Sequence, residues 1–121
     1  MNVVGIKSKE LLEEYVKNNT NYELGKRYKM VGQPDNVGYE VYFENGLGLS
    51  IIRDTNVSIF SKGWWEILPL TKDKELYTDR GHLGNAVPGV VAKYINIISK
   101  LEKIEDFEGW DDGDDGNRYD L

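Results

Sequence analysis

The sequence lacks the residues on which much protein chemistry depends. It contains no cysteine and a single histidine, His82, which excludes disulfides and thiolate metal sites and leaves zinc without a second strong ligand. No apolar run approaches the roughly 20 residues of a transmembrane helix. The first residues contain no apolar stretch of the kind that a signal peptide carries. We therefore expect no metal, no cofactor, no membrane partner and a cytoplasmic location.

Acidic residues are unevenly distributed along the 121 residues. Residues 102–121 contain nine acidic and two basic side chains, a sum of −7, whereas the rest of the chain contains twelve acidic and thirteen basic ones, a sum of +1. The net charge of −6 is thus a property of one segment. Because the length suits one domain, we predict a single domain over residues 1–105 and an acidic, flexible tail over residues 106–121.

Two segments have the apolar spacing of a helix. Residues 8–19 begin with Ser8, which can cap a helix, and end in a run of asparagines. Residues 90–104 follow Pro88, which is well placed to open a helix, and Gly109 prevents any continuation. The apolar side chains with helical spacing are Leu11, Leu12, Tyr15 and Val16 in the first segment and Val91, Tyr94, Ile95, Ile98 and Leu101 in the second.

The pair Asn45-Gly46 gives the clearest local signal, a β-hairpin. We predict strands over residues 39–43 and 47–53, joined by a two-residue type I′ turn. This register places Tyr42 opposite Leu49 and turns Tyr39, Val41, Phe43, Ser50 and Ile52 toward the core. Tyr42, Leu47, Leu49 and Ile51 then share the outer face, which the N-terminal helix is expected to cover.

Further strands are expected after the hairpin. The best candidate covers residues 64–70, where Pro69 favours a sheet edge. Shorter candidates cover residues 29–31, 57–60 and 76–77, whereas residues 33–36 are expected to form a turn and residues 81–89 a loop. The predicted fold class is α+β: an antiparallel sheet of three to five strands with an N-terminal and a C-terminal helix, followed by an irregular acidic tail.

Candidates for chemistry are few. Asp111 to Gly116 resembles a calcium loop, but Gly113 falls where a ligand is required and the position of the final glutamate lies beyond residue 121. His82 follows Asp79 and Arg80, which leaves a small-ligand site or an enzyme as a weaker option. Since the chain has no nucleophile motif to pair with this histidine, we predict that it is not an enzyme.

The charge pattern favours a basic protein partner over direct binding of nucleic acid. Lys26, Arg27 and Lys29 cluster only modestly, and the acidic segment would repel phosphate. Carboxylates spaced along a segment can instead occupy a groove that was built for a row of negative charge. The candidate partner-binding residues in this segment are Asp106, Glu108, Trp110, Asp111, Asp112, Asp114 and Asp115, with Phe107 and Tyr119 as further aromatic residues.

An aromatic sheet face offers a second candidate surface. Neighbouring strand residues point to opposite faces, so one of Trp64 and Trp65 faces the core and the other faces outward. Together with Tyr42, an outward tryptophan such as Trp64 would form an apolar patch that could bind a partner.

Residues 39–70 also resemble a known group of sequences. The chain has Tyr-Glu-Val-Tyr-Phe-Glu-Asn-Gly-Leu-Gly-Leu-Ser-Ile-Ile-Arg from Tyr39 and then Trp65-Glu66-Ile67. This resembles a loose group of short, mostly uncharacterised bacteriophage and prophage proteins. The chain departs from it at Leu47, where an aromatic residue is common, and in its acidic extension. The resemblance implies a small phage accessory protein, a class that includes many inhibitors of host defence.

Two functions from different classes follow. The first is a non-enzymatic phage or prophage protein that binds and inhibits a host nucleic-acid-binding protein through its acidic residues, in the manner of an anti-CRISPR protein. The alternative is an immunity protein, an antitoxin or a phage morphogenesis factor that binds its partner through the aromatic sheet face.

Overall fold

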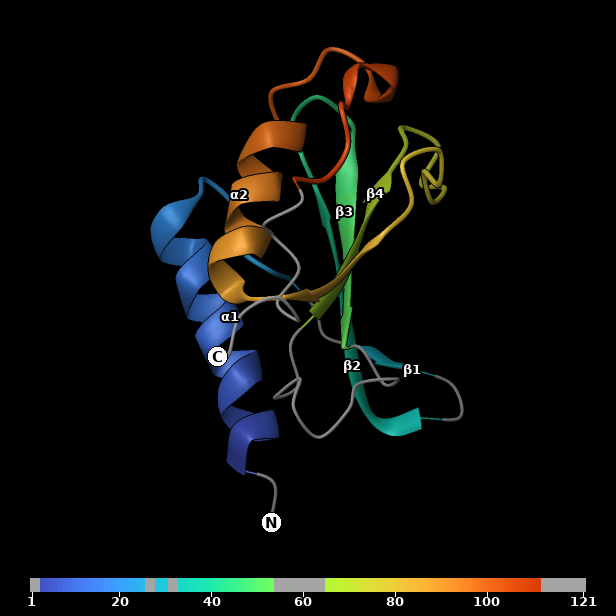
Figure 1. Ribbon diagram of the computed structural model, residues 1–121. Coiled ribbons are helices and arrows are strands. Elements are labelled where there is room, and N and C mark those ends of the chain that lie inside the picture. The colour runs from blue at the N-terminus through green and yellow to red at the C-terminus, as the bar shows by residue number, and fades with distance from the viewer. Residues whose placement is uncertain (1–2, 26–27, 31–32, 54–64, 112–121) are drawn as a thin grey trace.

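Two helices pack side by side against one face of a five-stranded antiparallel sheet (Figure 1). The computed structural model describes residues 3–25, 28–30, 33–53 and 65–111. Every strand pairs with its neighbour in sequence, so the sheet is a meander with the order β1-β2-β3-β4-β5. The elements are α1 (Val3–Asn19), β1 (Tyr28–Met30), β2 (Gln33–Tyr42), β3 (Gly48–Arg53), β4 (Trp65–Leu70), β5 (Leu83–Ala86), α2 (Pro88–Ile98) and the 3₁₀ turn η1 (Ile104–Asp106). The predicted α+β class is confirmed.

The core lies between the two helices and the sheet face that they cover. Leu12 and Val16 enter it from α1, and the α2 residues Val91, Tyr94, Ile95 and Ile98 enter it on the apolar stripe read from the sequence. The sheet contributes the buried side chains of Tyr39, Val41, Leu49, Ile51, Trp65 and Ile67. No helix in the described part of the chain is long and apolar enough to cross a membrane.

The hairpin register differs by one residue from the prediction. Phe43 pairs directly with Leu47: its N–H donates to the Leu47 carbonyl at 2.8 Å, and the Gly46 N–H donates to the Phe43 carbonyl at 2.9 Å. Gly46 has φ +88°, so the loop holds three residues and ends in a left-handed glycine rather than forming a two-residue type I′ turn. Val41 consequently faces Leu49, and Tyr42 faces Gly48.

This shift turns every side chain of β3 to the face opposite the predicted one. Leu47, Leu49 and Ile51, which were expected on the outer face, are buried in the core. Ile52, which was expected in the core, points to the opposite face and is half-buried. The core placement of Tyr39, Val41 and Phe43 is confirmed.

Several predicted boundaries were wrong. α1 begins at Val3 rather than near residue 8, and α2 ends at Ile98 rather than at residue 104. β2 begins at Gln33, where a turn was expected, and β5 lies in an expected loop. β5 is a short edge strand with the sequence Leu-Gly-Asn-Ala. It has none of the β-branched and aromatic residues that are typical of strands, so no pattern in the sequence indicated it. The candidate strand over residues 57–60 lies outside the described residues.

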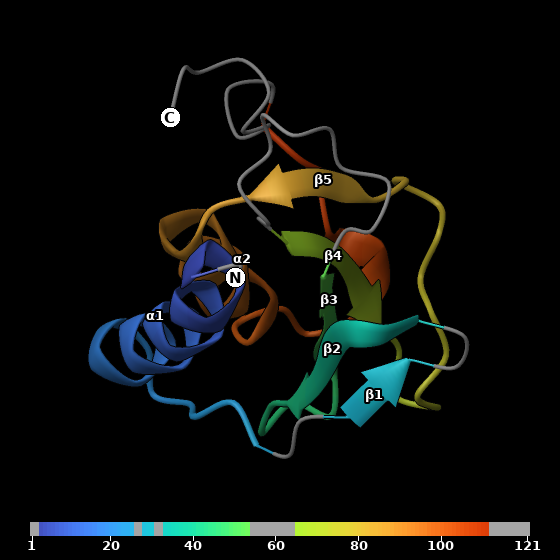
Figure 2. The same ribbon diagram turned by 90° about the horizontal axis from the view of Figure 1, so that it is seen from below.

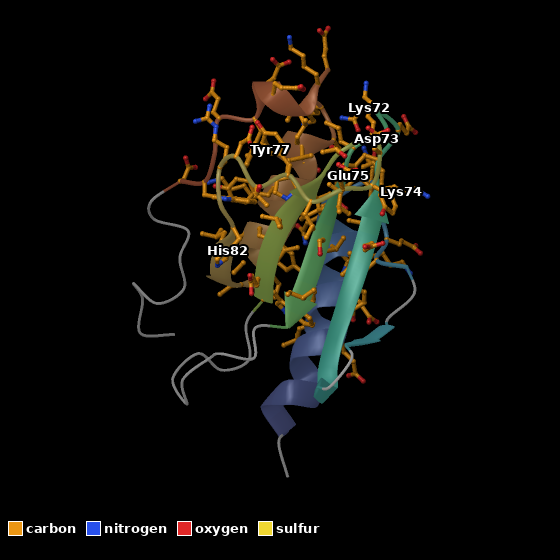
Figure 3. All side chains as sticks on the ribbon, turned by 90° about the vertical axis from the view of Figure 1, so that its right-hand side faces the viewer. Lys72, Asp73, Lys74, Glu75, Tyr77 and His82 are labelled. Atoms are coloured by element: carbon orange, nitrogen blue, oxygen red, sulfur yellow. The ribbon has the colours of Figure 1, made fainter. Side chains whose placement is uncertain are left out.

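Neither α1 nor α2 packs on the second face of the sheet, and the described residues place no other helix there. We call it the open face; it is made by Gly38, Glu40 and Tyr42 of β2, Gly48, Ser50 and Ile52 of β3, and Glu66, Leu68 and Leu70 of β4. In Figure 3 this face points toward the viewer and both helices lie behind the strands. Of the predicted outer face, Tyr42 therefore stays uncovered by the N-terminal helix, because α1 packs beside α2 on the other side, where Leu47, Leu49 and Ile51 are buried (Figure 2).

Candidate functional site

The acidic segment is bound to the body of the protein at its start. We call residues 104–111 the strap. Phe107 is only 1% exposed and belongs to the hydrophobic core, and Trp110 packs against the same cluster. The predicted boundary at residue 105 is therefore too early, because a buried phenylalanine holds at least residues 107–111 on the domain.

Three aromatic rings hold the strap on α2. The ring centroids of Tyr94 and Phe107 are 6.2 Å apart, those of Phe107 and Trp110 are 4.9 Å apart, and those of Tyr94 and Trp110 are 4.7 Å apart. All three pairs meet edge to face, an arrangement that aromatic rings favour. Gly109, with φ +102°, provides the turn that brings Trp110 back to Phe107.

Polar contacts complete the attachment. The Trp110 Nε1–H donates to the Gly81 carbonyl at 3.0 Å, and the Asp111 backbone N–H donates to the Tyr94 hydroxyl at 2.7 Å. Arg80 Nε donates to the Phe107 carbonyl at 3.3 Å. Lys93 and Asp111 form an exposed ion pair at 2.5 Å, which contributes little on its own.

These contacts divide the predicted site residues into two kinds. Trp110, which is half-buried, and Phe107, which is buried, hold the strap in place. Asp106 and Glu108 lie on the same strap with exposed side chains, and Asp111 is exposed apart from its pairing with Lys93. The carboxylates are thus the most exposed part of the strap, whereas Phe107 is buried and Trp110 is half-buried.

A further carboxylate reaches this surface from a distant part of the sequence. Partial burial, followed by the charge of Asp79, raises the pKa of Tyr77 above its usual value of 10.0; Arg80 acts in the opposite direction and Glu105 adds to the increase. The two residues that follow Asp79 contact the strap directly: Arg80 Nε donates to the Phe107 carbonyl, and the Gly81 carbonyl accepts from Trp110 Nε1–H. We define the acidic surface as Asp79, Glu105, Asp106 and Glu108, all of which are exposed. Nothing in the sequence relates Asp79 to the strap, because only the fold brings the two segments together.

Five predicted residues are not part of the strap as the structure describes it. Asp112, Asp114, Asp115 and Trp64 lie outside the described residues. Tyr42 is on the open face, where its hydroxyl donates to Glu40 Oε1 at 3.1 Å and Lys74 Nζ lies 5.3 Å from its ring centroid.

The residues considered for catalysis do not converge. His82 Nε2 lies 3.6 Å from Glu66 Oε1, and its side chain is 59% exposed. Arg80 contacts the Phe107 carbonyl and Asp79 lies beside Tyr77, so the three residues adjoin different partners. Figure 3 shows His82 and Tyr77 at separate positions along the edge of the sheet. Within the described ranges, no group of three or more metal-binding side chains is suitably arranged for an ion.

Comparison with known proteins adds no relative. No protein-family model, curated protein or solved structure matches this chain.

Proposed function

We propose that this chain is a small, non-enzymatic phage or prophage accessory protein that binds a basic host protein and blocks its access to nucleic acid. One observation carries the proposal: a buried phenylalanine, Phe107, fixes a strap whose neighbouring carboxylates are all exposed. The acidic surface therefore has a defined shape before any partner arrives. The assignment to phage, and with it a location in the bacterial cytoplasm, rests on the sequence resemblance of residues 39–70.

A preformed group of carboxylates suits a groove that binds nucleic acid. Such a groove presents lysine and arginine side chains to phosphates, and a protein that offers negative charge along it is attracted at long range. A flexible acidic segment must become ordered on binding, at a cost in free energy that a held segment avoids. The attachment through Phe107 and Trp110 thus favours a specific inhibitor over a segment that only increases solubility.

The charges near the strap are only partly balanced. Lys93 pairs with Asp111, and Arg80 donates to a backbone carbonyl. Residues 102–111 themselves contain one basic residue, Lys103, and five acidic ones. The acidic surface consequently keeps an excess of negative charge for a partner.

Removal of residues 106–121 is a poor test of this function, because it also removes Phe107 from the core. A charge-neutralised variant, Asp79→Asn with Asp106→Asn and Glu108→Gln, keeps every apolar contact. Bacterial proteins retained on DNA-cellulose at low salt are eluted with the wild-type protein and identified. We expect at least one DNA-binding protein to elute. In a gel-shift assay, addition of the wild-type protein should then prevent this DNA-binding protein from binding DNA.

The neutralised variant should elute at least tenfold less of that protein. The matched control is Glu10→Gln with Glu14→Gln and Glu23→Gln, three exposed acids outside the acidic surface, which should elute as much as the wild type. Elution should also weaken strongly as salt rises, since screened charges attract less. Equal elution by both triple variants, or no eluted protein at all, would overturn the proposal.

A further inference from the structure

The open face of the sheet has an apolar centre between two carboxylates. Ile52 and Leu68 lie half-buried at its middle, with Glu40 exposed on β2 and Glu66 partly exposed on β4. Glu40 pairs with Ser50, which pairs with Leu68, whereas Ile52 pairs with Glu66. Glu40 and Glu66 therefore lie two strands apart across the sheet and two residues apart along it. This corresponds to roughly 12 Å between their backbone positions.

One end of this face already holds a cation of the protein itself. The Lys74 ammonium group lies 5.3 Å from the Tyr42 ring centroid, and the Tyr42 hydroxyl donates to Glu40. A tyrosine ring beside a carboxylate attracts an ammonium or guanidinium group through both its quadrupole and the neighbouring charge. At the other end, Glu66 keeps 28% of its side chain exposed beside His82. Each end of the apolar centre thus offers an acceptor for positive charge.

We propose that the open face binds an extended, basic segment of a partner protein with the pattern Lys/Arg-x-apolar-x-Lys/Arg. In an extended chain the first and fifth residues of this pattern point the same way and lie roughly 13 Å apart, which matches the spacing of Glu40 and Glu66. The middle residue then covers Ile52 and Leu68, and the two cations pair with the two carboxylates. This surface goes beyond the proposed function, since it uses neither the strap nor Asp79.

The test is a titration of the full-length ¹⁵N-labelled protein with three acetylated and amidated peptides, Lys-Ser-Leu-Ser-Lys, Glu-Ser-Leu-Ser-Glu and Lys-Leu-Ser-Ser-Lys, followed by NMR. The first peptide should shift the amide signals of Ser50, Ile52 and Leu68, and it should bind at least fivefold more tightly than the other two. Signals of the strap should not shift, which separates this result from success or failure of the proposed function.

A double variant, Glu40→Gln with Glu66→Gln, should weaken binding of the first peptide at least tenfold while its NMR spectrum shows an intact fold. The matched control, Glu10→Gln with Glu14→Gln, removes two exposed charges from α1 on the far side of the sheet and should leave binding unchanged. Three results would overturn the proposal: equal binding of the three peptides, shifts confined to α1 or the strap, or no loss in the Glu40/Glu66 variant.

Discussion

At the scale of single residues, Gly48 is required by its neighbours. It faces Tyr42 across the hairpin. A Cβ atom at this position would lie 2.5 Å from the Val41 carbonyl oxygen and 2.9 Å from Tyr42 Cδ1. The tyrosine ring thus lies against the glycine backbone, with Lys74 near its ring as well. The two glycines of the hairpin have separate roles: Gly46 provides the left-handed turn residue, and Gly48 provides the space for a ring.

Replacement of Gly48 by alanine should therefore destabilise the protein. The clash involves backbone as well as a ring, so we expect a loss of about 2–3 kcal/mol, at the upper end for overpacking. Urea unfolding measures it. Gly25→Ala is the control, because a Cβ there meets nothing within 4 Å and should change stability by less than about 0.5 kcal/mol. Similar stability of the two variants would contradict the close packing of Tyr42.

Tyr77 should make stability sensitive to alkaline pH. Partial burial, with Asp79 and Glu105 nearby, raises its pKa above 10.0 in the folded protein, so its neutral form is favoured by folding. That contribution is complete below about pH 10 and is lost as the pH rises through the folded pKa, because the unfolded chain ionises first. Relative to pH 7, Tyr77→Phe should lose less stability than the wild type as the pH rises above about 10. Parallel stability curves for the two proteins would rule out this linkage.

At the scale of elements, the turn after α2 shows why helix ends are hard to read from sequence. The apolar spacing continues to Leu101 and Ile104, yet the helix ends at Ile98. Asn45 Nδ2 donates to the carbonyls of both Ile98 and Leu101 at 2.8 Å. The hairpin loop thus satisfies carbonyl groups at the C-terminal end of a helix that lies more than fifty residues away in sequence. Periodicity predicts that a helix exists, but this stop depends on a tertiary contact.

The hairpin itself illustrates the same limit. Asn45-Gly46 correctly predicts a reversal between two strands, because both residues tolerate turn conformations. The pair fits a two-residue or a three-residue loop, and one residue of difference decides which side chains are buried. In the three-residue loop, Asn45 Oδ1 accepts from the Leu47 N–H at 3.0 Å while its amide group contacts α2. The turn type is therefore linked to packing that local sequence does not contain.

The strap should contribute to stability although it belongs to the acidic segment. Phe107→Ala removes a buried ring that contacts Tyr94 and Trp110, and we expect a loss of about 3 kcal/mol. Phe107→Leu, which keeps most of the apolar volume, should lose clearly less. Thermal unfolding followed by circular dichroism compares the two variants. An unchanged midpoint for Phe107→Ala would restore the simple prediction of a domain that ends at residue 105.

At the scale of the whole molecule, the sequence predicts the fold class better than the surface. Two amphipathic helices and a meander can be inferred because each depends on local periodicity or turn residues. The position of Phe107 cannot, since acidic residues and glycines surround it and indicate a solvated tail. The acidic surface is also partly hidden from sequence, because Asp79 joins it only through the fold. Local patterns thus predict elements, whereas the shape of a binding surface arises from tertiary contacts.

Grouping carboxylates on one surface should cost stability at low ionic strength. Asp106 and Glu108 lie close to Glu105 and to each other along the strap, and repulsion among such exposed charges amounts to about 0.5 kcal/mol. Asp106→Asn with Glu108→Gln should therefore unfold at a higher temperature than the wild type in a buffer of about 10 mM salt. The difference should vanish near 1 M salt, where the screening length is short. A difference that is independent of salt would indicate a cause other than charge.

The burial of Phe107 also affects how the protein is made. The chain is synthesised from its N-terminus, and Phe107 is translated after α1, α2 and the strands β1 to β5. A nascent chain that ends before residue 107 leaves the Tyr94 ring without Phe107 and Trp110 as partners. The core is therefore completed only when the strap emerges from the ribosome. The carboxylates of the strap take their places on the surface at the same stage of synthesis.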